Sequence, residues 1–98
     1  MQINKIRGDQ TDQLFEAILS LQSVEECYQF FDDLCTMSEV QSLAQRFEVA
    51  AMLQNDKTYD EIQQETGAST ATISRVRRFV DYGSGGYKLA LARLKEEQ

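Results

Sequence analysis

The 98-residue sequence contains no proline and no histidine, and it has only five glycines and two cysteines. Runs that alternate between apolar and polar residues are also scarce, so we expect an all-α chain whose helices are separated by capping residues and glycines. The usual nitrogen and sulfur ligands of a metal site are nearly absent, and a nucleophile paired with histidine cannot be built. We therefore expect no metal ion, no catalytic residues and no enzymatic activity.

Long hydrophobic runs are missing as well. No apolar stretch approaches the length of a membrane-spanning helix, and residues 1–13 show no signal-peptide pattern. The expected location is cytoplasmic, with no membrane partner. Hydrophobic residues make up 42% of the sequence, which argues against a disordered chain, and the length predicts a single domain over residues 1–98.

The two cysteines, Cys27 and Cys35, lie in one predicted helical region. Their separation along such a helix is about 12 Å at the usual rise per residue. This distance is too long for an internal disulfide. We expect both cysteines to be small core residues.

Capping patterns and apolar spacing predict six helices. The first begins at Thr11, the second follows the capping pair Ser23 and Glu26, and the third begins at the similar pair Ser38 and Gln41. The fourth and fifth lie within residues 58–80, and the sixth covers residues 87–98 after a flexible glycine-rich link at residues 81–86. Residues 1–10 are expected to form a flexible N-terminal arm.

The first two predicted helices would expose a large apolar surface by themselves. They could pack on the rest of the same chain, or they could interlock with a second copy. The dense apolar content of so small a domain favours a homodimer.

Residues 58–80, TYDEIQQETGASTATISRVRRFV, have the spacing of a helix-turn-helix. Thr58 and Glu61 form a capping box at the start of the first helix. Gly67 can adopt the left-handed backbone that a sharp turn between two helices requires. A capped helix pair with a glycine turn also occurs in proteins that do not bind DNA, so the motif alone leaves both readings open.

The second helix of the motif begins at Ser69, a predicted N-cap, and turns one face inward. That apolar stripe consists of Ile73, Val76 and Val80. The outward face has short hydroxyl residues at the helix start, where base edges are usually met, and guanidinium groups toward its end, where phosphates are reachable. The predicted DNA-binding residues are Ser69, Thr70, Ala71, Thr72, Arg75, Arg77 and Arg78.

The formal net charge of −6 argues against a simple DNA-binding protein, because nonspecific affinity comes from cations that displace counterions. The charge is uneven, however. Residues 1–65 contain 4 basic and 13 acidic side chains, whereas residues 66–98 contain 6 basic and 3 acidic ones. The acidic part should either weaken long-range attraction to DNA or serve only as a solubilising surface.

Residues 43–79, LAQRFEVAAMLQNDKTYDEIQQETGASTATISRVRRF, resemble the Trp repressor family, and within it the TrpR-related YerC/YecD group. The most specific match is TGASTATISR at residues 66–75, and the order of the six predicted helices extends the similarity to nearly the whole chain. The resemblance implies an intertwined homodimer whose core is formed by the first three helices and the last. Two helix-turn-helix motifs would then enter successive major grooves of a roughly palindromic operator, with half-sites about 34 Å apart.

The member that gives this family its name binds tryptophan as a corepressor between two arginines, which by motif position correspond to Arg46 and Arg75. A glycine follows the second arginine in the family, whereas Val76 follows it here, and residues 77–79 are bulkier than the family's small polar residues. This bulk is expected to crowd the indole site, so tryptophan or another small-molecule corepressor is disfavoured and no cofactor is expected. In the alternative interpretation, the two arginines lie at the surface or face phosphates.

Two hypotheses about function remain open. The first is a homodimeric, sequence-specific DNA-binding transcriptional regulator, a repressor that blocks polymerase by occupying a palindromic operator. The alternative is a helical protein–protein interaction module that keeps the fold without specific DNA binding. Its support is the net negative charge and the acidic Asp60 in the first motif helix. Tyr59, Asp60 and Gln63 stand where the resemblance implies basic or neutral residues that contact phosphates. Salt dependence separates the two, because binding to several phosphates falls steeply with salt.

Overall fold

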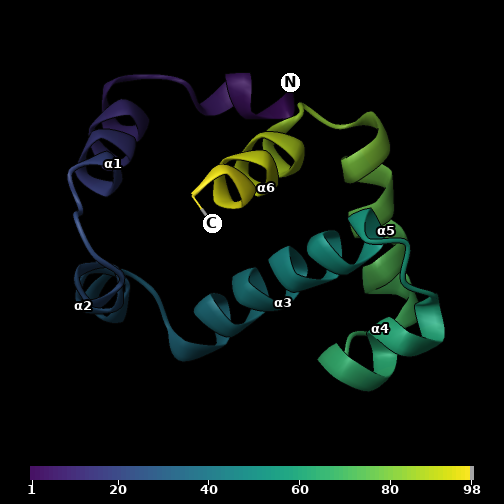
Figure 1. The fold of residues 1–98 in the computed structure, drawn as a ribbon. Helices are drawn as coiled ribbons and strands as arrows, with labels where there is room; N and C mark the ends of the chain where they lie inside the picture. Colours follow the sequence, from purple (N-terminus) through teal and green to yellow (C-terminus); the bar gives the residue numbers. More distant parts are fainter. Residues whose placement is uncertain (98) are drawn as a thin grey trace. The chain divides into compact units, whose positions relative to one another are not determined.

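The computed structural model describes residues 1–97, which form six α-helices and one short 3-10 helix, without a β-strand (Figure 1). The elements are η1 (Gln2–Ile6), α1 (Asp9–Leu19), α2 (Val24–Leu34), α3 (Met37–Gln54), α4 (Tyr59–Thr66), α5 (Thr70–Tyr82) and α6 (Gly86–Glu96). The prediction of an all-α chain with six helices is confirmed. Gln98, the last residue of the predicted sixth helix, lies outside the described residues. None of the helices in the described part combines the length and apolar character needed to cross a membrane.

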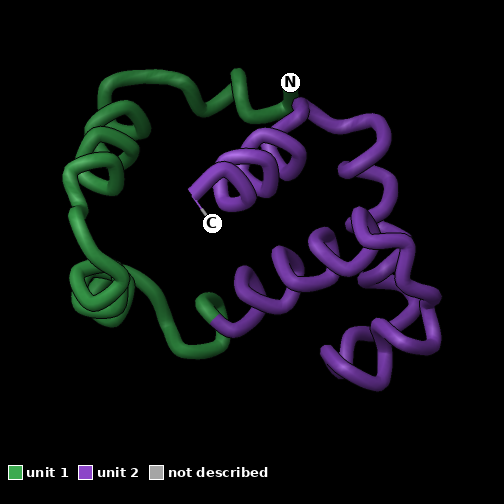
Figure 2. Tube along the Cα trace, in the orientation of Figure 1, with its two compact units in different colours: residues 1–40 green, residues 41–98 purple. Residues whose placement is uncertain are grey.

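The chain divides into two compact units, which Figure 2 colours separately and which are described one at a time. Unit 1 is Met1–Val40 and contains η1, α1, α2 and the first residues of α3. Unit 2 is Gln41–Gln98 and contains the rest of α3 with α4, α5 and α6. The single domain over residues 1–98 and the flexible arm at residues 1–10 stay predictions, although residues within that arm form η1.

The first helix of unit 1 begins earlier than predicted. Gly8 is the N-cap of α1 and forms no side-chain capping bond. The hydroxyl of Thr11 donates instead to the carbonyl of Ile6 at 2.5 Å. The prediction that α1 begins at Thr11 is therefore wrong, because this hydroxyl bonds back to the preceding η1 from within the helix.

The starts of α2 and α3 also differ in detail from the predicted capping boxes. Ser23 caps α2 by accepting from the N–H of Glu26 at 3.0 Å. The carboxylate of Glu26, however, accepts from the N–H of Gln22 at 2.8 Å. Only half of the predicted box at α2 is therefore present.

At α3 the capping box lies two residues before the predicted one. The hydroxyl of Thr36 accepts from the N–H of Glu39 at 3.1 Å, and the Glu39 carboxylate accepts from the N–H of Thr36 at 2.9 Å. The bond from the Thr36 backbone N–H to the carboxylate, followed by one from the Thr36 hydroxyl, lowers the pKa of Glu39, since both favour the charged form. The prediction of a start at Ser38 with Gln41 is wrong, because both residues lie inside the helix.

Unit 1 has no buried side chain. Leu19, Val24 and Tyr28 are 83%, 74% and 69% exposed, so α1 and α2 present apolar faces that remain uncovered in the chain. Cys27 is exposed and Cys35 is half-buried. Their predicted place in a core is therefore wrong for Cys27 and only partly met for Cys35, since no core closes around these helices.

Unit 2 contains the hydrophobic core. It is built from the second half of α3, from α4, from the turn that follows α4, and from α5. The buried residues are Val49, Ala50, Met52, Leu53, Ile62, Ala68, Ile73 and Val76, and the partly buried Val80, Tyr87 and Leu91 pack against them. Full burial of a side chain such as Ile62 or Ile73 contributes roughly 1.5–3 kcal/mol. The predicted inward stripe of α5 is confirmed, and it holds this helix on the core.

Candidate nucleic-acid interface

The start of α4 is fixed by the predicted capping box. The hydroxyl of Thr58 accepts from the N–H of Glu61 at 3.2 Å, and the Glu61 carboxylate accepts from the N–H of Thr58 at 3.1 Å. The backbone bond from Thr58, followed by the bond from its hydroxyl, holds the pKa of Glu61 below its ordinary value. Two otherwise unpaired helix-end amides are thereby satisfied.

The turn between α4 and α5 is tied to both helices and to α3. Gly67 has a φ of 73°, the predicted left-handed conformation, and its N–H donates to a carbonyl of the last turn of α4 at 2.9 Å. The hydroxyl of Thr66 donates to the carbonyl of Ile62 at 2.7 Å and accepts from the N–H of Ala68 at 3.1 Å. The side-chain amide of Gln45, on α3, donates to the carbonyl of Thr66 at 3.1 Å. These bonds fix the position at which α5 begins.

The start of α5 is capped as predicted. The Ser69 hydroxyl accepts from the N–H of Thr72 and donates to the hydroxyl of Thr72, both at 3.1 Å. Ser69, Thr70 and Ala71 are exposed, while Thr72 is half-buried. The hydroxyl groups of Ser69 and Thr72 are therefore partly engaged with each other, whereas Thr70 presents its side chain to solvent.

The three arginines of α5 do not share one face. Each residue advances about 100° around an α-helix, so Ala71 and Arg78 lie nearly opposite the buried side chains, and Arg75 lies about 100° from the buried Val76. Arg77 lies about 40° from the buried Ile73 on the same scale, at the edge of the core stripe. Arg78 is thus the arginine that points most directly away from the core, whereas Arg75 is exposed at the side of the helix.

Arg77 also has a partner that the sequence reasoning missed. Its Nε lies 3.4 Å from Oδ2 of Asp81, and the two side chains are 49% and 45% exposed. The spacing of four residues on a helix is a recognised signal for such a pair. Part of the positive charge of α5 is therefore neutralised within the helix.

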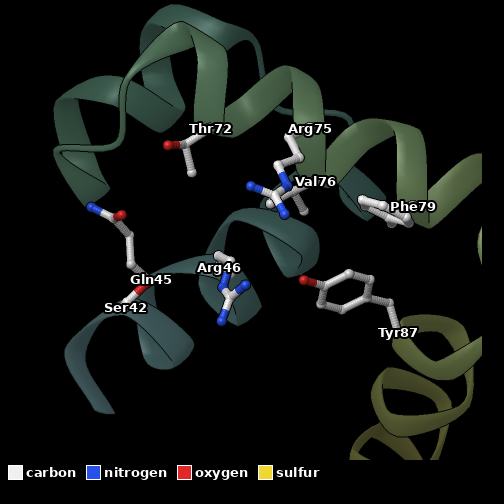
Figure 3. A pocket seen from close by; sticks show the side chains of 8 residues that line it. All are labelled: Ser42, Gln45, Arg46, Thr72, Arg75, Val76, Phe79 and Tyr87. Carbon is white, nitrogen blue, oxygen red and sulfur yellow. The ribbon is translucent and has the colours of Figure 1, made fainter. Parts of the chain in front are cut away.

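A pocket in unit 2 lies between α3, α5 and α6 and has a volume of about 210 Å³ (Figure 3). It is lined by Ser42, Gln45, Arg46, Thr72, Arg75, Val76, Phe79 and Tyr87. The structure thus brings together Arg46 and Arg75, the two candidate effector residues, and no acidic side chain lines the pocket. Tyr87 was not predicted as a site residue, because only the tertiary arrangement brings α6 to this place.

A family model described as Trp repressor protein matches residues 9–95. The chain belongs to the Trp repressor family. It is 62% identical, over all 98 of its residues and 94% of the relative, to YerC of Bacillus subtilis (strain 168), a protein that is itself uncharacterized.

Two solved structures support the Trp repressor fold. A Trp repressor candidate from Staphylococcus aureus superposes with a TM-score of 0.94 and 57% identity, covering 97% of this chain and 95% of that chain. A TrpR-like protein from Eubacterium eligens ATCC 27750 superposes with a TM-score of 0.91 and 53% identity, covering 94% and 95%. The family and fold inferred from residues 43–79 are confirmed. The roles of individual residues in DNA or effector binding stay predictions.

The Trp repressor family raises the question of whether tryptophan fits this pocket. Val76 is 2% exposed and belongs to both the core and the pocket wall, which Phe79 and Tyr87 complete. The volume of about 210 Å³ is below the roughly 300 Å³ at which ligand pockets usually begin. The expectation that bulk at Val76 and Phe79 crowds an indole ring between Arg46 and Arg75 stays a prediction.

Proposed function

We propose that this chain is a homodimeric, sequence-specific DNA-binding transcriptional regulator that represses by occupying a palindromic operator. The observation that carries the proposal is the exposed face of α5. It presents Arg78 opposite the face that Ile73 and Val76 anchor in the core, and the exposed Arg75 at the side of the same helix. A rigid helix with an exposed cationic face is suited to the major groove, and membership of the Trp repressor family supports the same role.

In the proposed complex, the N-terminal turn of α5 reads base edges. Ser69 and Thr70 offer hydroxyl groups, Ala71 offers a methyl group, and Thr72 supports Ser69 through their hydrogen bonds. Arg75 and Arg78 contact phosphates or guanine edges. Arg77 contributes less, because it is paired with Asp81.

The homodimer is part of the proposal because unit 1 leaves apolar faces uncovered. The exposed Leu19, Val24 and Tyr28 would be buried by a second copy of the chain. Two copies of α5 would then meet half-sites about one DNA turn, roughly 34 Å, apart. The regulator would act in the cytoplasm and would perform no catalysis.

The alternative of a protein–protein interaction module has its own support. Helix α4 carries three acidic side chains and no basic one, and all three are exposed: Asp60, Glu61 and Glu65. Unit 1 has two basic and eight acidic residues, so it accounts for the net charge of −6. Both features oppose binding to phosphates.

The test is selection of bound sequences from a random duplex library, at two salt concentrations and with or without L-tryptophan. We expect a palindrome to be enriched by the wild-type protein and lost at the higher salt. The Arg75→Ala, Arg78→Ala double variant should fail to enrich it. The matched control is Arg93→Ala, Lys95→Ala, which removes the same charge from α6 and should still select the palindrome. If the wild type is a folded dimer that enriches nothing, the interaction module is favoured.

A further inference from the structure

Tyr87 lies on α6 at the pocket that α3, α5 and α6 surround. It stands in the first turn of α6, directly after the glycine link, where Gly85 takes a left-handed φ of 86° as the N-cap. Its ring stacks on Phe47 of α3, with centroids 6.4 Å apart and ring planes 29° apart. Figure 3 shows the tyrosine extending from α6 into the pocket, with its hydroxyl on the side of Arg46.

The second half of α5 has no fully buried anchor, in contrast to the first half. The fully buried anchors of α5 are Ile73 and Val76, both in its first seven residues. Beyond them, Val80 is only partly buried and Phe79 is 45% exposed. Phe79 of α5 and Tyr87 of α6 line the same pocket. The end of α5 that carries Arg78 therefore lacks a fully buried anchor, and its Phe79 shares a pocket with Tyr87 of α6.

We infer that Tyr87 is a positioning residue that fixes α5 against α3, so that no small-molecule ring is needed between Arg46 and Arg75 to hold the DNA-reading helix. Its aromatic ring supplies from within the chain the packing that a bound ring would otherwise supply. One consequence is that DNA binding does not require tryptophan, and this consequence rests on the proposed function. The other is that Tyr87 keeps α5 ordered, which can be tested without DNA.

The first experiment measures amide hydrogen exchange of the full-length chain without DNA. Tyr87→Ala should speed exchange in the second half of α5, because the lateral support of that segment is lost. Tyr87→Phe keeps the ring and should match the wild type. Leu91→Ala is the matched control: Leu91 is also half-buried on α6 and packs on the core, but it does not line the pocket. It should leave the exchange pattern of α5 unchanged relative to the rest of the core.

The second experiment measures affinity for the selected duplex by fluorescence anisotropy. Tyr87→Ala should bind about tenfold more weakly if the competent orientation of α5 falls to about a tenth of the population. Added p-cresol should restore the affinity, since a small aromatic molecule can occupy an apolar cavity left by truncation. The wild type and Tyr87→Phe should not respond to p-cresol or to L-tryptophan.

Each outcome decides the inference. Equal exchange in α5 for the wild type and Tyr87→Ala would overturn the positioning role, whether or not the protein binds DNA. A wild type that binds its duplex only with L-tryptophan would overturn the ligand independence. If no duplex is selected, the proposed function fails while the exchange comparison still tests Tyr87. If circular dichroism shows Tyr87→Ala to be unfolded, Tyr87→Leu, which keeps apolar volume without the ring, takes its place in both experiments.

Discussion

Replacement of Arg78 by alanine should weaken the salt dependence of DNA binding in a way that can be calculated. Arg78 is exposed, lies nearly opposite the core face of α5, and forms no ion pair within residues 1–97. A guanidinium group in that position is free to displace a counterion from a DNA phosphate. Removing it should therefore remove one such displacement from each copy of the chain.

The size of the effect follows from counterion release. Each phosphate contact contributes about −0.9 to the slope of log K against log salt concentration, so a dimer that loses two contacts should show a slope shallower by about 1.8. Fluorescence anisotropy of the selected duplex, over a series of potassium chloride concentrations, measures both slopes. Circular dichroism melting of the variant checks that the fold is unchanged.

Arg77→Ala is the matched control for Arg78→Ala, because the two arginines are adjacent and chemically identical. Arg77 lies beside the core stripe and is paired with Asp81 at 3.4 Å, so part of its charge is already compensated. Its removal should change the slope by clearly less than the removal of Arg78. The assignment of the DNA-facing side of α5 would be refuted by an unchanged slope for Arg78→Ala together with a large change for Arg77→Ala.

Three further predictions concern the stability of the motif. Gly67→Ala should lower the free energy of unfolding by about 1 kcal/mol in urea titrations: a Cβ at this position meets no atom within 4 Å, so the cost is the left-handed φ of 73° itself. Glu61→Gln should be less stable than the wild type near pH 7. Because the pKa of Glu61 is lowered in the folded state, the carboxylate's contribution is present above the ordinary value of 4.5 and is lost as the pH falls through the lowered value, so the two proteins should converge in acid. Ile73→Ala should cost about 2–5 kcal/mol, since Ile73 is fully buried, whereas the exposed Ala71→Ser should change the same urea midpoint very little.

Local signals in the sequence were sufficient to predict the helix-turn-helix. The capping bonds of Thr58 and Ser69 and the left-handed Gly67 each depend on residues within one helical turn, so their geometry is encoded locally. The inward stripe of α5 follows from its helical period alone. The same locality explains the error at α3, where two overlapping patterns competed. Thr36 with Glu39 prevailed over Ser38, because a carboxylate near a helix N-terminus is favoured over a neutral amide.

The remaining features depend on chain segments that meet only in the fold. No periodicity in α6 indicates that Tyr87 stacks on Phe47, because these residues are distant in sequence. The exposure of Cys27 reflects the absence of a core around α2, which composition alone does not reveal. The pair of Arg77 and Asp81 is different: its spacing was available in the sequence, and it was missed because the arginines were considered only as DNA ligands.

The distribution of charge links DNA binding to assembly. Unit 2 has eight basic and eight acidic residues, so its net charge is zero. The arginines of α5 therefore belong to a neutral unit and not to a broadly basic surface. Unit 1 is acidic and has exposed apolar faces, which suit it to pairing with a second copy and not to contact with phosphates. One α5 with three arginines, one of them paired with Asp81, gives few phosphate contacts. Two copies held on one DNA double the number of contacts, and the second α5 binds at the high effective concentration set by the first. Specific binding in the proposed function therefore requires the dimer, and a variant that cannot dimerise should lose the operator even with α5 intact.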